Sequence, residues 1–226
     1  MNIIQLHKHT LNFPHPNEAN KDGIVAWGGD LTPSRLLKAY QNGIFPWYSE
    51  CDPIIWWSPN PRLIMHLHDF KLSRSLKKSM QKFTYKFDTN FEQVLRNCKN
   101  APRKEQAGTW ISEEIIEAYV ALFAIGKAHS VESYKDGKLV GGLYGVVVGG
   151  VFCGESMFAT CSDASKSAYA ILVKHLQTWG YDFIDCQVPT SHLKSLGAKE
   201  VSREYFLQKL KESQKKIPQH QWLVSI

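Results

Sequence analysis

Hydrophobic residues recur along the chain with two different periods, and these periods predict where helices and strands lie. Spacings of three and four residues, which gather apolar side chains on one face of a helix, occur in four stretches that each follow a capping residue. In one of them, Thr89 and Glu92 have the spacing of a capping box. The four helices are predicted to begin after Thr32, Thr89, Ser112, and Ser162 or Asp163.

A run rich in glycine and valine predicts a buried β-hairpin in the second half of the chain. The run is nearly free of charge from Gly141 to Phe158, and Gly149-Gly150 supplies the positive φ that a tight turn needs. Asp136-Gly137 predicts a further turn, which joins an earlier strand at 131–134 to the first strand of the hairpin. The hairpin is therefore expected at the centre of a larger sheet.

The helix that follows Asp163 is predicted to lead directly into a strand at 181–187. A helix that returns at once to a strand is typical of parallel or mixed sheets. Alternation along this strand places Phe183, Asp185 and Gln187 on one face, so Asp185 and Gln187 are expected to point the same way. Together, the patterns predict an α+β fold with a central mixed β-sheet flanked by helices.

Residues 1–61 differ in composition from the rest of the chain. They are rich in Pro, Gly and aromatic residues and contain one predicted helix, whereas the long hydrophobic patterns come later. A length of 226 residues and 43% hydrophobic content are enough for a small domain and a medium one. The predicted division is a small aromatic-rich N-terminal domain at 1–61 and a second domain at 62–226.

A cationic stripe is predicted on a helix that starts at Asp69. Its apolar side carries Leu72, Leu76, Met80 and Phe83, and no acidic residue occurs from 71 to 86. The net charge of +6 and the pI of about 9.0 also favour a polyanionic partner, although a stripe of this kind can simply be a solvated face. Phosphate contacts are predicted for Lys71, Arg74, Lys78 and Lys82.

Three polar residues in apolar surroundings are the candidates for chemistry. Glu155 lies in the second strand of the hairpin, where a charge is costly to bury unless it has a partner. It is therefore either part of a salt bridge or held for a ligand with a positive charge. Asp185 and Gln187 lie near the carboxyl end of their strand, which is where a ligand crevice is expected in such sheets.

Cysteine usage and hydropathy narrow the cellular setting. The five cysteines form no CxxC pair, and their odd number argues against a disulfide framework. No cluster of residues has the spacing of metal ligands, and no apolar run has the length of a signal peptide or a membrane span. The sequence predicts a cytoplasmic protein that binds neither a metal nor a membrane.

Several long sequence words resemble one family across nearly the whole chain. The words GGLYG, FCGESMF, ASK, IDCQ, HLKSLGA, GGDLTPSRLLKAYQNGIFPW and WWSPNPR resemble bacterial leucyl/phenylalanyl-tRNA protein transferase. The resemblance implies an aminoacyltransferase that moves Leu or Phe, or also Met, from charged tRNA to the N-terminal Lys or Arg of a protein, which creates an N-end-rule degradation signal. It also implies that the second domain is an acyltransferase domain of the GNAT type.

The resemblance also assigns roles to residues. Asp185 is expected to activate the acceptor amine, Gln187 to orient it, and Glu155 to help hold amine groups. No cofactor is expected, because an aminoacyl ester is already activated. The pocket for the donor side chain is expected to consist of Leu143, Phe152, Met157 and Ile184. Stacking on the 3′-terminal adenosine is expected from Trp47, Trp110 and Tyr40, although aromatic clusters are more commonly part of a core.

Two other functions fit parts of the sequence. A CoA-dependent N-acetyltransferase needs a glycine-rich loop at a helix N-terminus, and the segment 157–163 contains no glycine. An RNA-binding protein without catalysis explains the stripe, and also Arg103 and Lys104 in a later loop, but not Glu155, Asp185 and Gln187. The transferase is the interpretation that uses all of these features.

Overall fold

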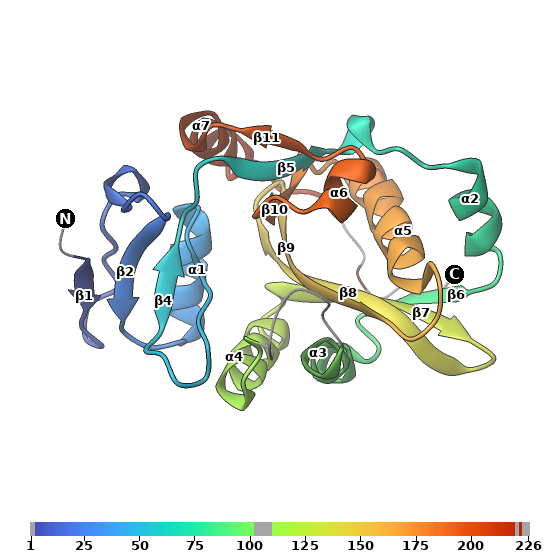
Figure 1. Ribbon diagram of the computed structural model, residues 1–226, viewed down its shortest axis with the longest axis horizontal. Coiled ribbons are helices and arrows are strands. Elements are labelled where there is room, and N and C mark those ends of the chain that lie inside the picture. Colours follow the sequence, from blue (N-terminus) through green and yellow to red (C-terminus); the bar gives the residue numbers. More distant parts are fainter. Residues whose placement is uncertain (1–2, 102–109, 220–221, 223–226) are drawn as a thin grey trace.

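The computed structural model describes residues 3–101, 110–219 and 222, and these residues form two β-sheets (Figure 1). The smaller sheet consists of β1 (Ile4–Leu6), β2 (Ile24–Gly28), β3 (Phe45–Pro46) and β4 (Ile55–Trp57). Its strand order is β1-β2-β4-β3, with β1 parallel to β2 and the remaining neighbours antiparallel. The helix α1 (Pro33–Gln41) follows β2 and begins at the predicted Thr32 cap.

The larger sheet begins at β5 and contains seven strands. They are β5 (Arg62–His66), β6 (Thr84–Phe87), β7 (Ala128–Lys135), β8 (Lys138–Val148), β9 (Val151–Ala159), β10 (Phe183–Gln187) and β11 (Lys199–Val201). The strand order is β11-β5-β10-β9-β8-β7-β6. Only the pair β9 and β10 is parallel, so the sheet is mixed. The predicted α+β class is confirmed.

Helices cover both faces of the larger sheet (Figure 1). The long helix α5 (Ala164–Thr178) packs on β7, β8 and β9, while α3 (Phe91–Asn100) and α4 (Glu113–Ala124) lie on the opposite face. Two hydrophobic clusters result, one on each face. The remaining helices are α2 (Arg74–Met80), α6 (Ser191–Ser195), α7 (Arg203–Ser213), and two 3₁₀ turns at Pro16–Glu18 and Leu67–Asp69.

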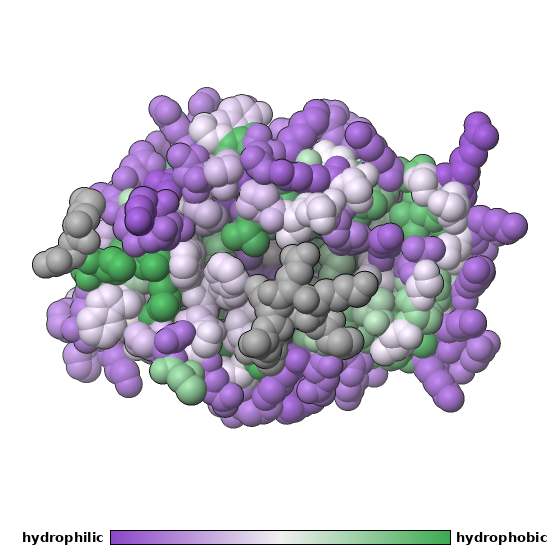
Figure 2. All heavy atoms as spheres, in the orientation of Figure 1, coloured by the Kyte–Doolittle hydropathy of each residue, from purple (hydrophilic) through white to green (hydrophobic). Residues whose placement is uncertain are grey.

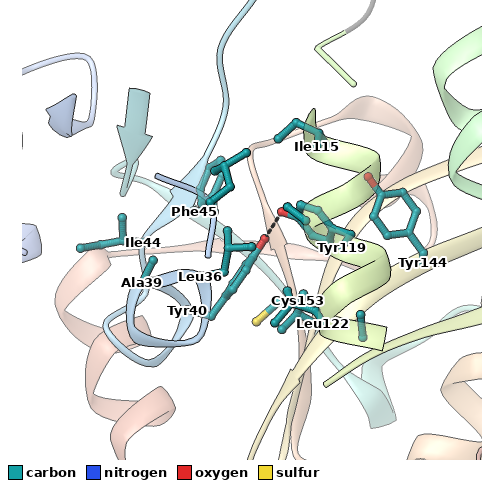
Figure 3. Packing of buried hydrophobic residues seen from close by; sticks show 14 of the residues in the cluster. Leu36, Ala39, Tyr40, Ile44, Phe45, Ile115, Tyr119, Leu122, Tyr144 and Cys153 are labelled. Carbon is teal, nitrogen blue, oxygen red and sulfur yellow. Dashed lines mark hydrogen bonds between the residues drawn. The ribbon is translucent and has the colours of Figure 1, made fainter. Parts of the chain in front are cut away.

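The small sheet is joined to the larger one through α1 and α4. Figure 3 shows Leu36 and Tyr40 of α1 beside Ile115, Tyr119 and their neighbours, and the hydroxyls of Tyr40 and Tyr119 are hydrogen-bonded. The chain passes from one sheet to the other over residues 58–61. Because the hydrophobic core is continuous across this point, the division into domains at 61 stays a prediction.

Most of the predicted elements occur where the hydrophobic pattern placed them. The turn at Gly149-Gly150 joins β8 to β9, and the turn at Asp136-Gly137 joins β7 to β8. The predicted capping box is wrong, because the hydroxyl of Thr89 is hydrogen-bonded to Glu132, and Asn90 is the cap of α3. The buried carboxylate of Glu132 accepts the N–H groups of Thr89 and Asn90, which immediately precede the first residue of α3.

The helix that was predicted to start at Asp69 is shorter than the pattern indicated. It begins at Arg74, because the Ser73 hydroxyl accepts the N–H of Leu76 at 3.1 Å and caps the helix there. The preceding backbone is held elsewhere, since the N–H of Lys71 donates to the carbonyl of Leu196. Consequently Leu72 is 44% exposed and does not share a buried face with Leu76.

The surface is mainly hydrophilic on the face shown in Figure 2, with apolar patches between the polar residues. One of these patches lies over the small sheet. Exposed apolar side chains in this part of the chain belong to Ile3, Ile4 and Leu11, which are 36%, 49% and 41% exposed. Scattered apolar exposure of this extent is normal for a folded protein.

Candidate active site

A cavity of about 300 Å³ lies among β8, β9, β10, α5 and α6. Its wall is largely apolar, and all four residues predicted for a side-chain pocket contribute to it: Leu143, Phe152, Met157 and Ile184. Tyr169 and Leu172 of α5 and Leu193 of α6 extend the apolar wall. Polar groups in the wall come mainly from Glu155, Ser156, Gln187, Thr190 and His192. The cavity is at the lower end of the volume range for small-ligand sites.

Two β-bulges bring polar side chains to this cavity. On β9, Gly154 pairs with Gly145 and Ser156 with Tyr144, so Glu155 is the extra residue without a partner on β8. On β10, the register shifts between Asp185 and Gln187, and Gln187 has a φ of 63°. The parallel pairing of β9 with β10 extends to Cys153 and Asp185. Just beyond it, the Gln187 side-chain amide donates to Glu155 Oε1 at 2.7 Å.

Glu155 is held by neutral partners. The Tyr119 hydroxyl donates to its Oε2 at 3.0 Å, and Tyr40 in turn is hydrogen-bonded to Tyr119. Burial, opposed by these hydrogen bonds, raises the pKa of Glu155 to about 7. No salt bridge to Glu155 occurs among the described residues. Of the two interpretations of this carboxylate, a structural ion pair is therefore wrong for the part of the chain that the structure describes.

Asp185 has a different environment from the one that strand alternation predicts. It is 1% exposed, and its carboxylate forms two hydrogen bonds with the guanidinium of Arg62, at 2.8 Å and 2.6 Å. The cavity wall contains Ile184, Cys186 and Gln187 but not Asp185. The expectation that Asp185 and Gln187 point the same way is thus wrong, because the bulge inserts a break in the alternation.

The three aromatic residues expected to stack on a terminal base differ in accessibility. Tyr40 is 1% exposed and packs within the core between α1 and α4, so a base has no access to its ring (Figure 3). Trp47 and Trp110 are half-buried, and Trp47 also contacts the ring of Trp57 at a centroid distance of 5.4 Å. Stacking is therefore open to Trp47 and Trp110 and excluded for Tyr40.

The cationic residues of the predicted stripe are all exposed. Arg74 and Lys78 lie on α2, whereas Lys71 precedes this helix and Lys82 follows it. Within the described ranges, the ion pairs do not involve any of the four. They are thus free of the acidic neighbours that neutralise a solvated face. Arg103 and Lys104 lie outside the described residues.

Sequence reasoning missed three residues at or behind the site. Arg62 stands in the word WWSPNPR but carries no local sign of its partner, which is 123 positions away. Tyr119 lies at an apolar position of the helix after Ser112, and this spacing predicts only core packing. His192 lines the cavity, and burial, followed by the charge of Lys166, lowers its pKa. Arg62 and His192 each belong to a word that carries the family resemblance, WWSPNPR and HLKSLGA, whereas Tyr119 belongs to none of these words.

Neither a metal centre nor a membrane-spanning helix is present among the described residues. No group of three or more His, Cys, Asp or Glu side chains is arranged to hold a metal ion there. Nor does the described part of the chain contain a helix with the length and apolarity needed to cross a membrane.

The fold and the cavity together indicate a class of protein. A mixed sheet carries a largely apolar cavity of about 300 Å³, and a carboxylate and an amide stand together in its wall. An apolar cavity with a few convergent polar groups is the arrangement expected of an active site or a small-ligand site.

Comparisons with known proteins identify the family. The family model described as "Leucyl/phenylalanyl-tRNA protein transferase" matches residues 64–211, and the model of that family's N-terminal domain matches residues 29–60. The chain belongs to the leucyl/phenylalanyl-tRNA protein transferase family, and it is an aminoacyltransferase. A leucyl/phenylalanyl-tRNA protein transferase of Sulfurimonas denitrificans is 70% identical over 220 residues, which cover 97% of this chain and 96% of that protein.

A less similar sequence relative belongs to the same family, whereas the similarity to solved structures is weak. The corresponding protein of Nitrosospira multiformis is 54% identical over 204 residues and covers 88% of each chain. Among solved structures, a GCN5-related N-acetyltransferase from Kribbella flavida has a TM-score of 0.37 and 12% identity. That similarity covers 73% of this chain and 59% of the acetyltransferase.

Proposed function

We propose that this chain transfers Leu or Phe from aminoacyl-tRNA to the α-amine of an N-terminal Lys or Arg of a protein. The observation that carries the proposal is the apolar cavity of about 300 Å³ with Glu155 and Gln187 in its wall. An aminoacyl ester presents two groups at one carbon, an apolar side chain and an amine, next to the carbonyl that reacts. The cavity offers a matching surface for each of them.

The donor side chain is proposed to occupy the apolar part of the cavity. Phe152 and Ile184 are 0% and 1% exposed and form a firm wall. Met157 is half-buried, and its unbranched thioether adapts to guests of different shape, which suits a site that takes both Leu and Phe, and also Met.

Glu155 and Gln187 are proposed to meet the amine groups. The acceptor amine attacks the ester carbonyl and the C–N bond forms. The bond to the ribose oxygen breaks, the amine loses a proton, and the ribose oxygen gains one and leaves as a hydroxyl. Since an α-amine has a pKa of about 8, about a tenth of it is neutral at pH 7, and a carboxylate such as Glu155 with a pKa of about 7 suffices as proton acceptor. The Gln187 amide orients the attacking group, which is a matter of proximity and alignment.

Asp185 is proposed to act through Gln187 rather than on the amine directly. Its Oδ1 accepts the backbone N–H of Gln187 at 3.0 Å, and both of its oxygens bond the Arg62 guanidinium. Both carboxylate oxygens are thus occupied by hydrogen bonds within the fold.

Two half-buried tryptophans and the cationic stripe are proposed to bind the tRNA. Trp47 and Trp110 stack on the 3′ end, and the phosphates of the acceptor stem contact the exposed stripe of Lys71, Arg74, Lys78 and Lys82. The product is a protein whose new N-terminal residue serves as an N-end-rule degradation signal, which requires a cytoplasmic location.

One incubation tests the proposed function. The protein is mixed with Leu-tRNA and a peptide that begins with Arg, and the peptide is examined by mass spectrometry. The expected product is the peptide extended by one Leu, with no product from an N-acetylated peptide. A parallel incubation with acetyl-CoA in place of Leu-tRNA should give no acetylated peptide. Extension that fails with both Leu-tRNA and Phe-tRNA would contradict the proposal.

A further inference from the structure

We propose that Arg62 is a positioning residue for the transfer reaction, and that it conveys the placement of the small sheet to Gln187. This inference rests on the proposed function, in which Gln187 orients the acceptor amine. Arg62 does not line the cavity, so any effect it has on the reaction must pass through other residues.

The guanidinium of Arg62 is fixed on every side that the structure describes. It is 1% exposed, and its Nε and Nη2 donate to the two oxygens of Asp185. Its carbon lies 4.8 Å from the ring centroid of Phe45 and 4.4 Å from that of Phe206. Its Nη1 donates to the carbonyl of Gly43 at 3.2 Å. A planar guanidinium with five N–H donors can bond the Asp185 carboxylate and the Gly43 carbonyl at the same time, whereas a lysine ammonium can reach only some of these acceptors.

A continuous series of contacts leads from Arg62 to the cavity. The Asp185 carboxylate that Arg62 orients accepts the backbone N–H of Gln187. That hydrogen bond holds Gln187 at a φ of 63°, which is an unfavourable conformation for a residue with a side chain and persists only where the surroundings fix it. In this conformation the Gln187 amide reaches Glu155 and the cavity.

The same series begins in the part of the chain that carries the small sheet. Gly43 and Phe45 follow α1, and Gly43 has a φ of 72° that aims its carbonyl toward Arg62. A Cβ at Gly43 would lie 2.7 Å from Phe206, so this close approach requires glycine. The α1–β3 connection is thereby coupled to the bulge on β10 by one side chain.

A buried ion pair can also be merely structural, and a double-mutant cycle separates the two roles. The variants are Arg62→Lys, Gln187→Ala and the double variant, assayed for single-turnover rate and for tRNA binding. If Arg62 acts through Gln187, Arg62→Lys lowers the rate by about 100-fold in the wild-type background, as for a displaced orienting group, and has almost no effect in the Gln187→Ala background. Affinity for tRNA should change little in either background.

Arg35→Lys provides the matched control. Arg35 is also a fully buried arginine, paired with Asp30 at 3.1 Å, but it lies in the part of the chain that carries the small sheet, away from the cavity. Its effect on the rate should be small and equal in both backgrounds. If Arg62→Lys does not fold, Phe45→Leu loosens the same guanidinium and is expected to show the same dependence on Gln187.

Equal rate losses for Arg62→Lys with and without the Gln187 side chain would overturn the inference while leaving the proposed function intact. A wild-type protein that extends no peptide would contradict the proposed function itself. The two failures are therefore told apart by the wild-type measurement.

Discussion

The pKa of Glu155 is shifted although none of the ion pairs among the described residues gives this side chain a partner of opposite charge. Its two hydrogen-bond partners, Tyr119 and Gln187, are neutral, so desolvation is the largest influence on its pKa. A carboxylate with a pKa of about 7 changes its charge within the pH range in which the enzyme is expected to work. Its protonation therefore affects both stability and activity.

The variant Glu155→Gln should be more stable than the wild type at pH 8, and the difference should shrink by pH 5. The folded protein holds the Glu155 proton with a pKa of about 7 against 4.5 for the free side chain, so its stabilising effect is fully present below 4.5 and is lost as pH rises through 7. Thermal midpoints at the two pH values measure this, at roughly 2–4 °C for each kcal/mol in a chain of this size. A midpoint that falls by many degrees at pH 8 would instead indicate a structural role for the charge.

The same variant should lose transfer activity, because an amide cannot accept a proton. In the wild type the single-turnover rate is expected to rise with pH through about 7, as Glu155 deprotonates. A rate for Glu155→Gln with the same value and the same pH profile as the wild type would contradict the role given to this residue.

Asp185→Ala and Gln187→Ala should both lower turnover much more than tRNA affinity, but they should differ in stability. Removing the Asp185 carboxylate leaves the buried Arg62 charge unpaired, which typically costs about 3–5 kcal/mol. Removing the Gln187 amide leaves no buried charge alone, so the loss should be much smaller. Urea denaturation of both variants measures the contrast, and near wild-type turnover for Asp185→Ala would contradict its proposed role.

At the scale of elements, the site depends on irregularities in two neighbouring strands. The bulges on β9 and β10 lie beyond the last parallel pair, Cys153 with Asp185, where the strands separate. A bulge redirects the side chains that follow it, and here it turns Gln187 toward Glu155 and leaves Asp185 on the other side. Strand alternation without a bulge therefore predicted the wrong direction for Asp185.

Replacing Met157 or Ile184 by Ala should enlarge the apolar part of the cavity and shift the choice of donor. Phe is expected to gain relative to Leu by about 1–3 kcal/mol, the usual effect of one or two methylene groups in such a site. Competition between Leu-tRNA and Phe-tRNA for one acceptor peptide gives this ratio. Val146→Ala is the control, because Val146 is buried in β8 but does not line the cavity. A donor ratio that stays unchanged in both pocket variants would place the pocket elsewhere.

At the scale of the whole molecule, the small sheet and α2 lie at opposite ends (Figure 1). A ligand that touches both Trp47, beside the small sheet, and the cationic stripe near α2 must extend across most of the larger sheet. A charged polymer such as the acceptor arm of a tRNA has this length, and its phosphates supply contacts that do not depend on base sequence.

Neutralising the stripe should therefore reduce both tRNA affinity and its dependence on salt. Each Ala substitution at Lys71, Arg74, Lys78 or Lys82 that removes a phosphate contact should lower the slope of log affinity against log salt by roughly one. The loss should be similar for different tRNA bodies.

Lys8, Lys21 and Lys38 are exposed in the part of the chain that carries the small sheet, and their replacement is the control. Unaltered affinity and slope in the fourfold variant would mean that the stripe is only a solvated face, and the tRNA path would then be sought near Arg103, Lys104 or the C-terminal lysines.

Hydrophobic periodicity and turn residues alone determined most of the elements of this protein and its mixed sheet, and the family resemblance added the residues that wall its cavity. The elements and the sheet follow from local rules, because burial of one face and the backbone freedom of glycine act over a few residues. The tertiary structure alone decided the partner of Asp185 and the exclusion of Tyr40. Each of these depends on a residue far away in the chain, namely Arg62 and Tyr119. Local sequence patterns do not predict contacts between distant residues. The orientation of the proposed catalytic groups is therefore known only from the folded arrangement of the strands.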